Sequence, residues 1–177
     1  MRIISGKYRG RTIVPPRNLR ARPTTDFAKE NLFHVLTNLV DFEDCDILDL
    51  FSGTGSISYE FASREARSVT SVELNSVHHN FIRTTARELG FENFYAVKAN
   101  AFLYLKSCGK KFDIIFSDAP YDLEGSDALV DMVFEKGLLR EGGVFIFEHS
   151  KNQDFSSHPK FVRQRNYGSV QFSIFEA

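Results

Sequence analysis

One tetrapeptide of this chain, Asp118-Ala119-Pro120-Tyr121, combines residue types that could do chemistry together. It follows the apolar run of residues 112–116, which has the composition of a buried strand. A carboxylate, a backbone carbonyl restricted by the following proline and an aromatic ring would then stand at one strand end. The two oxygens can accept hydrogen bonds from an amine on a flat ring, and the tyrosine can stack on that ring. We take Asp118, Ala119, Pro120 and Tyr121 as the candidate catalytic residues.

Two glycines follow an earlier strand-like segment, residues 46–51. Gly53 and Gly55 let the backbone come close to a ligand, although they also suit a plain tight turn. The dinucleotide-binding fingerprint has a glycine or alanine three residues later, where this chain has Ser58, so a nucleotide-dependent oxidoreductase is disfavoured. The order Asp-x-Phe-x-Gly-x-Gly is similar to the loop that holds the methionine part of S-adenosylmethionine (SAM). The loop residues predicted to bind this cofactor are Asp49, Phe51, Ser52, Gly53, Thr54 and Gly55.

Polar residues also end the next two predicted strands. Glu73, which lies 24 residues after Asp49, can accept hydrogen bonds from both hydroxyls of a ribose, or it can serve as a surface acid that caps the next helix. Asn100 and the backbone N–H of Ala101 suit the edge of an adenine, and Asn100 suits a helix cap equally well. The remaining cofactor-binding candidates are Glu73, Leu74, Asn75, Asn100, Ala101 and Asp118.

Alternating strand and helix patterns must position these residues. The predicted strands are residues 46–51, 68–74, 95–98, 112–117 and 144–148, and the predicted helices are residues 56–64, 76–89, 101–108 and 126–136. This alternation implies parallel pairing with right-handed crossovers, and ligands then bind beyond the carboxyl ends of the strands. Residues 161–165 and 170–175 flank Asn166-Tyr167-Gly168-Ser169 with no helix between them and predict a β-hairpin. The predicted fold class is α/β: a Rossmann-like, SAM-dependent methyltransferase with a mostly parallel, doubly wound sheet and a C-terminal antiparallel hairpin.

The first 22 residues carry seven basic side chains and no acid, whereas the other 155 residues carry a net charge of −8. A basic arm on an acidic body favours a polyanionic partner, although a solvated arm would show the same charges. Residues 2–5 and 11–14 predict a short β-hairpin, and residues 26–40 predict an amphipathic helix. We therefore divide the chain into a basic N-terminal hairpin and linker, residues 1–23, for which the family resemblance described next implies RNA contact, and a SAM-dependent methyltransferase domain, residues 24–177.

Two N-terminal segments resemble the RsmD-type family of bacterial enzymes. These are Arg2-Ile3-Ile4-Ser5-Gly6-Lys7-Tyr8-Arg9-Gly10-Arg11 and Arg22-Pro23-Thr24-Thr25-Asp26, and the resemblance covers essentially the whole chain. That family uses SAM to methylate the exocyclic amine (N2) of a guanine in small-subunit (16S) rRNA. The resemblance implies that the partner is rRNA or a small ribosomal subunit particle. It implies phosphate contacts from Lys7, Arg9, Arg11 and Arg22.

The candidate catalytic tetrapeptide is similar to the (Asp/Asn)-Pro-Pro-(Tyr/Phe) motif of methyltransferases that act on exocyclic amines, and it departs from that motif at Ala119. Alanine keeps the carbonyl but loses the rigidity of a proline ring. The same motif serves adenine in RNA or DNA and the side-chain amide of glutamine, so these substrates remain open. Two further hypotheses stay open as well: a catalytically weakened RNA-binding relative and a nucleotide-dependent oxidoreductase.

Length and composition set broader limits. A chain of 177 residues fits one domain with a full core, and no apolar run approaches the roughly 20 residues of a membrane span. The N-terminus has no apolar signal-peptide core, which predicts a cytoplasmic enzyme with no membrane partner. Cys45 and Cys108 lack a metal-ligand spacing, so we expect ordinary thiols and no metal.

Overall fold

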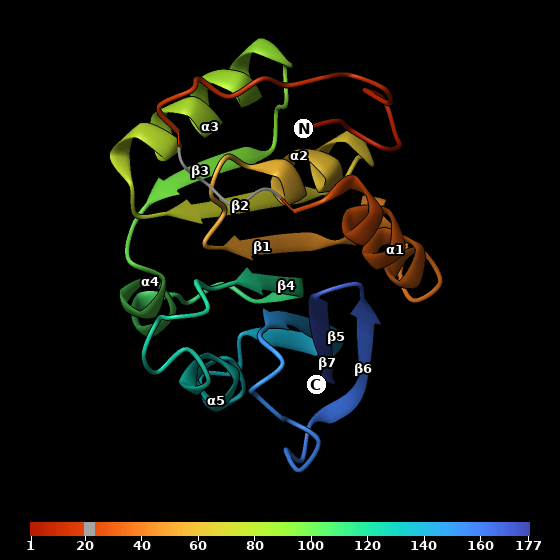
Figure 1. Cartoon of the computed structure of the whole chain (residues 1–177), viewed down its shortest axis with the longest axis vertical. Coiled ribbons are helices and arrows are strands. Elements are labelled where there is room, and N and C mark those ends of the chain that lie inside the picture. Colours follow the sequence, from red (N-terminus) through yellow and green to blue (C-terminus); the bar gives the residue numbers. More distant parts are fainter. Residues whose placement is uncertain (20–23) are drawn as a thin grey trace.

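The computed structural model describes residues 1–19 and 24–177. One seven-stranded sheet has the strand order β3-β2-β1-β4-β5-β7-β6, and Figure 1 shows β3, β2, β1, β4 and β5 following one another from top to bottom. The strands are β1 (Asp46–Leu50), β2 (Ser68–Glu73), β3 (Phe94–Lys98), β4 (Phe112–Asp118), β5 (Leu139–His149), β6 (Phe161–Tyr167) and β7 (Val170–Glu176). The first five pair in parallel, and β7 pairs antiparallel with both β5 and β6. The predicted fold class is confirmed.

Two apolar layers cover the sheet. The helices are α1 (Asp26–Thr37), α2 (Ser56–Ser63), α3 (Ser76–Glu88), α4 (Ala101–Ser107) and α5 (Ala128–Glu135), with a short 3-10 helix η1 (Phe42–Asp44) before β1. On one face, α1 and α2 bury side chains such as Phe33 and Phe61 against Ile47 of β1. On the other face, α4 and α5 pack against Leu48, the next residue of the same strand. This alternation explains why the parallel strands read as continuous apolar runs.

Most predicted boundaries shift by only a few residues. The first helix ends at Thr37 instead of residue 40, because the chain leaves the helix through a tighter turn in which Leu39 N–H donates to the Leu36 carbonyl. The strand expected from residue 144 begins at Leu139, since Leu139 already pairs with Phe112 of β4 before the chain bends. Both differences arise at element ends, where tertiary pairing outweighs local composition.

The N-terminal segment is an antiparallel loop instead of the two-stranded hairpin that its sequence pattern predicts. A single bridge, Arg2 to Thr12, is formed, and backbone bonds such as Ile3 N–H to the Arg11 carbonyl hold the two halves together. Ile3 and Ile13 are buried beside Tyr59 of α2. Backbone hydrogen bonds within the segment and packing of its isoleucines on α2 therefore both hold it in place.

A buried ion pair anchors the segment. Lys29 of α1 and Glu60 of α2 are almost inaccessible to solvent, with Nζ and Oε2 3.7 Å apart. Glu60 also accepts hydrogen bonds from the backbone N–H groups of Ile4 (2.9 Å) and Ser5 (3.0 Å). Burial lowers the pKa of Lys29, while the Glu60 charge opposes that shift. The ion pair thus satisfies backbone donors of the arm and joins it to the helix that follows the glycine loop.

Gly6 shows how closely the arm approaches α2. Its φ is +84°, and a Cβ placed there would lie 2.0 Å from the carbonyl oxygen of Ser63. A side chain larger than hydrogen would push the arm off the helix. The division into an RNA-contacting arm and a methyltransferase domain stays a prediction about function, since both parts share this packing. No helix among the described residues has the length and apolar character needed to cross a membrane.

Candidate active site

The predicted site residues meet at the carboxyl ends of β1, β2 and β4. Asp49 pairs in register with Phe116, two residues before Asp118, and with Ser71, two residues before Glu73. Register partners on parallel strands point to the same face, so all three acids lie on the face that α1 covers. The strand order reverses between β1 and β4, which is where open α/β sheets bind ligands.

A small cavity of about 40 Å³ lies between the glycine loop and Asp118, the first residue of the candidate catalytic tetrapeptide. Its walls include Thr24, directly before the cap of α1, and Asp118 at the end of β4. The predicted cofactor residues that line it are Asp49, Phe51, Ser52, Gly53, Thr54 and Asp118. Because the cavity is small, only one end of a ligand fits inside, and the remainder would lie along the neighbouring strand ends.

The backbone of the glycine loop is held in left-handed conformations. Gly53 has φ +59° and Gly55 has φ +91°, and a Cβ on Gly55 would lie 2.6 Å from the Tyr59 ring. Phe51 has φ +58°, which is unusual for a bulky residue. Strained backbone of this kind persists only where the surroundings over-determine it, and it concentrates at functional sites. The loop conformation is therefore preformed, and its backbone geometry requires glycine at positions 53 and 55.

Asp49 is the buried acid under this loop. It is 1% exposed, and Ser58 Oγ donates a hydrogen bond to Oδ2 at 2.5 Å. Burial raises the pKa of Asp49 to about 7, the Ser58 hydrogen bond opposes the rise, and the nearby charges of Asp118 and Glu73 add to it. A cationic ligand group beside Asp49 would favour its ionised form. Ser58 entered the sequence argument only as a departure from a fingerprint, so its supporting role was missed.

Glu73 holds the glycine loop from the next strand. Its carboxylate accepts hydrogen bonds from the backbone N–H groups of Gly53 and Asn75, both at 2.8 Å. A carboxylate offers about four acceptor positions, so two contacts leave room for the hydroxyls of a ribose. The acid therefore orders the loop as well as facing a possible ligand.

Both candidate asparagines cap helices. Asn75 Oδ1 accepts hydrogen bonds from the first turn of α3, and Asn100 Oδ1 accepts one from Leu103 N–H at 3.2 Å in α4. Leu74 is 59% exposed and Leu103 is 63% exposed, so two apolar side chains stand near these caps at the strand ends. Sequence reasoning did not single out Leu103, although its position in the first turn after Asn100 was visible. The arrangement offers apolar contact and backbone N–H groups to a flat ring.

The tetrapeptide places its aromatic ring in solvent and its alanine in the core. Tyr121 is 40% exposed, and its hydroxyl lies 3.4 Å from Oε1 of Glu148. Glu148 is 3% exposed at the end of β5 and is the register partner of Asp118. Ala119 is 3% exposed and packs in the core layer of α4 and α5. Glu148 was missed by sequence reasoning, although an acid that ends a predicted strand was a usable signal.

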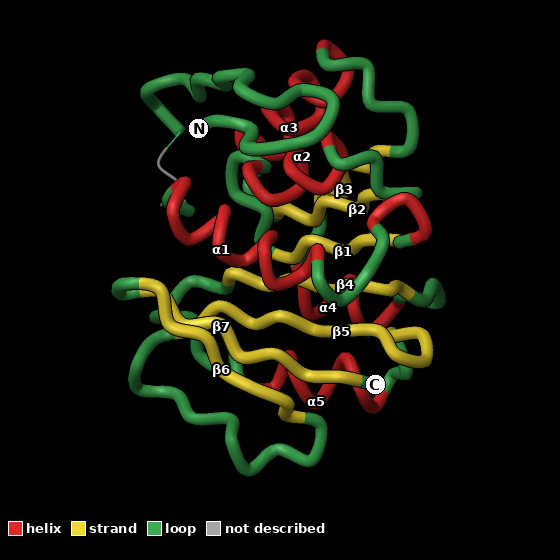
Figure 2. Tube along the Cα trace, turned by 90° about the vertical axis from the view of Figure 1, so that its right-hand side faces the viewer, coloured by secondary structure: helices red, strands yellow, loops and turns green. Residues whose placement is uncertain are grey.

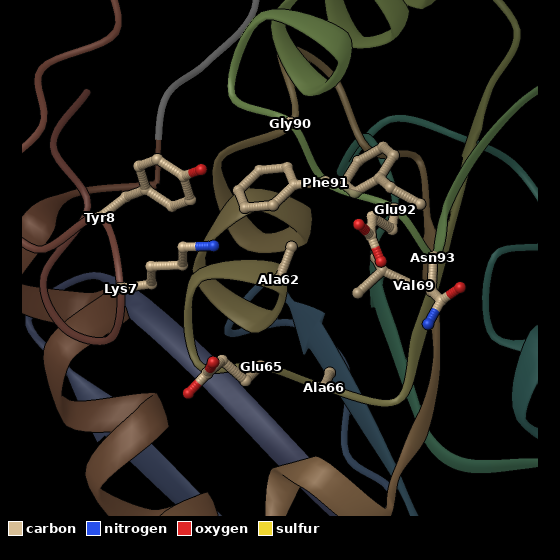
Figure 3. A pocket seen from close by; sticks show the side chains of 11 residues that line it. Lys7, Tyr8, Ala62, Glu65, Ala66, Val69, Gly90, Phe91, Glu92 and Asn93 are labelled. Carbon is tan, nitrogen blue, oxygen red and sulfur yellow. The ribbon is translucent and has the colours of Figure 1, made fainter.

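Three of the four predicted RNA contacts lie among the described residues, and none of these three lines the small cavity. Lys7 lines a different cavity, of about 310 Å³, at the amino ends of β2 and β3, where Figure 3 shows it with Tyr8 and Phe91. Arg9 lines a groove with Arg2 and Glu30, beside α1. Arg11 is exposed on the arm, and Arg22 lies outside the described residues. Lys7, Arg9 and Arg11 are thus spread along the arm instead of lining one cavity.

Comparison with known proteins supports the predicted resemblance. Residues 1–176 match the model of the family described as conserved hypothetical protein 95. The ribosomal RNA small subunit methyltransferase D of Buchnera aphidicola is 30% identical over 84% of this chain and 75% of that protein. The solved structure of yhhF from Escherichia coli has a TM-score of 0.86 and 27% identity, covering 99% of this chain and 97% of that one.

A more distant structure shares the fold. The Thermus thermophilus 16S rRNA N2-guanine methyltransferase RsmC, solved with AdoMet and guanosine, has a TM-score of 0.68 at 19% identity. The match covers 86% of this chain and 43% of that chain. At this low identity the similarity shows a shared fold and no more. The family model spans nearly every residue, and the chain therefore belongs to the conserved hypothetical protein 95 family, the RsmD family.

Proposed function

We propose that this protein uses SAM to methylate the exocyclic amine N2 of a guanine in small-subunit rRNA. The observation that carries the proposal is the shared cavity, in which Asp118 of the tetrapeptide stands beside the glycine loop over Asp49. This adjacency would bring a methyl donor and an amine into contact. The names of the family's relatives, ribosomal RNA small subunit methyltransferase D, support the choice of substrate.

The residues present fit SAM. The α-amino group and the sulfonium of SAM carry positive charge, and the site offers a buried acid, Asp49, with acidic neighbours. In this proposal the Glu73 carboxylate accepts hydrogen bonds from the ribose hydroxyls. Leu74 packs against the adenine ring, and the backbone N–H of Ala101 donates a hydrogen bond to its edge. Asn75 and Asn100 act indirectly, because their side chains cap the helices that present these groups. The bound cofactor supplies an activated methyl group, so the protein contributes position and electrostatics.

The tetrapeptide would hold the amine. The Asp118 carboxylate and the Ala119 carbonyl accept hydrogen bonds from the two N–H groups of the amine. These bonds direct the nitrogen lone pair toward the methyl group and stabilise the positive charge that develops on nitrogen. The amine's extra proton leaves to water. Tyr121 stacks on the base, and its contact with Glu148 limits rotation of the ring. Burial of the Ala119 side chain supports a fixed carbonyl despite the missing proline, since packing restricts the same backbone.

Methyl transfer from labelled SAM to rRNA tests the proposal. Small-subunit rRNA and assembled subunits from a strain lacking this protein serve as substrates, and the modified nucleotide is then mapped. We expect one N2-methylguanine, and a product on adenine or on protein glutamine would instead select one of those amines. Transfer to no substrate, together with retained RNA binding, would indicate a catalytically weakened relative.

Calorimetry addresses the cofactor separately. We expect SAM to bind and NADH not to bind, since Ser58 stands where the dinucleotide fingerprint requires glycine or alanine. Failure of SAM to bind at millimolar concentration would overturn the proposed function. A cytoplasmic location is part of the proposal, and the two free thiols, Cys45 and Cys108, fit a reducing compartment.

A further inference from the structure

We propose that a second RNA-contacting surface lies on the opposite side of α1 from the arm. This hairpin surface consists of Phe27, Arg163, Arg165 and Tyr167, and it binds the unpaired RNA strand that flanks the target base. The inference rests on the proposed function, because it assumes an RNA substrate.

An exposed aromatic pair forms one end of the hairpin surface. Phe27 is 62% exposed in the first turn of α1, and its ring meets the Tyr167 ring edge to face with centroids 6.3 Å apart. Tyr167 in turn packs against buried Phe172 at 6.1 Å. The pair is therefore fixed from below and open to solvent above. Such rings are stacking platforms for unpaired bases, with little dependence on sequence.

A row of positive charge leads to these rings. Arg163 pairs in register with Ile174 and Arg165 with Phe172, so both arginine side chains leave the sheet on the α1 face, as Tyr167 does. No Asp or Glu occurs between Asp154 and Glu176, whereas the chain after its first 22 residues has a net charge of −8. Because β6 is the last strand in the sheet order, this row lies along an open edge. Cations spaced along an edge with aromatic rings suit a phosphate backbone with splayed bases.

The turn end of the hairpin surface lies near the carboxyl ends of the parallel strands, where the candidate active site is. Gln171, next to the β6–β7 turn, pairs with His149 at the carboxyl end of β5, directly after Glu148. Figure 2 shows the start of α1 and the β6–β7 turn on one side of the molecule. Thr24, three residues before Phe27, lines the cofactor cavity. A strand bound on the hairpin surface would therefore pass beside the site that receives its target base.

The arm lies against the same helix turn. Arg2 pairs with Asp26 at 3.4 Å, and the next residue, Phe27, contacts Tyr167. The first turn of α1 thus stands between the basic arm and the basic hairpin. An RNA strand that crosses this turn would contact both, which explains why the arm's charges need not point into the active site.

Filter binding of small-subunit rRNA fragments at several salt concentrations tests the inference. Arg163→Ala combined with Arg165→Ala should weaken binding and reduce the slope of log affinity against log salt by about 1.4, the value for two lost phosphate contacts on a single strand. Phe27→Ala should weaken binding roughly 5- to 100-fold with the slope unchanged. Lys111→Ala combined with Lys136→Ala is the matched control, since it removes two exposed charges away from β6, one directly before β4 and one at the end of α5.

Equal behaviour of the arginine and lysine double variants, with both folded in urea titrations, would overturn the hairpin surface. That result would leave the proposed function intact as long as the unmodified protein still methylates rRNA. If the unmodified protein neither binds nor methylates rRNA, the proposed function fails first. If both double variants lose RNA affinity by the same large factor, RNA binding depends on the overall charge of the protein and not on the hairpin surface.

Discussion

The amino and carboxyl ends of β1 each hold an aspartate, and the two aspartates have opposite electrostatic surroundings. At the amino end of β1, Asp46 lies 2.9 Å from Arg67 and 2.8 Å from Arg140, with Lys110 at 3.8 Å. Burial would raise the pKa of Asp46, but hydrogen bonds from Arg67, Ser68 and Arg140 hold it well below its usual range. The chain itself thus neutralises this acid.

At the carboxyl end of β1, three residues away, no ion pair to Asp49 is formed within residues 1–19 and 24–177. Burial raises its pKa to about 7, and Ser58 provides one hydrogen bond. The difference indicates that the protein's own cations neutralise Asp46 at the amino end, whereas the carboxyl end is suited to a cationic ligand. Asp46 contributes to stability, whereas near pH 7 a cationic group bound beside Asp49 would shift this acid toward its ionised form.

The largest effect should come from the catalytic acceptor. Asp118→Ala removes the carboxylate proposed to hold the target amine, and methyl transfer should fall about 10²- to 10³-fold. SAM binding measured by calorimetry should largely survive. Asp122→Ala, an exposed aspartate four residues later, is the control and should retain activity. Full activity of Asp118→Ala would remove this residue from the mechanism.

At the opposite edge, Asp46→Ala should change stability and leave SAM affinity unchanged. It breaks three ion pairs whose cationic partners are 38% to 48% exposed, so the loss should be about 1–3 kcal/mol of unfolding free energy in urea titrations. Because the folded-state pKa of Asp46 is lowered, its contribution is present above pH 4 and disappears as pH falls toward the folded-state pKa. Asp44→Ala is the exposed control. An unchanged urea midpoint for Asp46→Ala would contradict the contrast.

The acid under the loop should make SAM binding depend on pH. Below pH 7 free Asp49 is mostly protonated, and a cationic ligand favours the ionised form, so binding must release a proton. The SAM Kd should therefore be about tenfold higher at pH 6 than at pH 8, which corresponds to one pKa unit. Asp49→Asn should abolish this dependence, and exposed Asp127→Asn should keep it.

The stability of the Asp49→Asn variant should also reflect the raised pKa of Asp49. Since the folded-state pKa is raised from 3.8 to about 7, ionisation of Asp49 costs folding free energy as pH rises through that interval. The asparagine variant should then be at least as stable as the parent at pH 8. A parent protein that gains stability between pH 5 and pH 8 because of Asp49 would show that a cation already neutralises this acid.

The smallest effect should come from Ser58→Ala, which removes the hydroxyl that favours ionised Asp49. The midpoint of the pH dependence of SAM binding should rise by less than about one unit, so affinity at pH 7 should fall severalfold. Ser71→Ala is the matched control, because Ser71 is the buried register partner of Asp49 and its hydroxyl has no partner among the described residues. A midpoint that stays in place would mean that Ser58 serves packing alone.

Local patterns were enough to locate the strand ends and therefore most of the candidate site. Gly53, Gly55, Glu73 and Asp118 were found because periodicity marks where each strand stops, and parallel strands must end at one edge. Contacts between distant segments were beyond such patterns. Glu148 meets Tyr121 across 27 residues, and Glu60 meets Ile4 across 56.

The sequence by itself determined the order of elements, the glycine positions that need left-handed backbone and the residues that follow each strand. Tertiary structure decided which acids are neutralised and which are left for a ligand. Asp46 and Asp49 are chemically identical and three residues apart, yet their pKa values move in opposite directions. The reason is physical: desolvation and charge pairing depend on what other segments bring near a carboxylate, and only the folded chain supplies those neighbours.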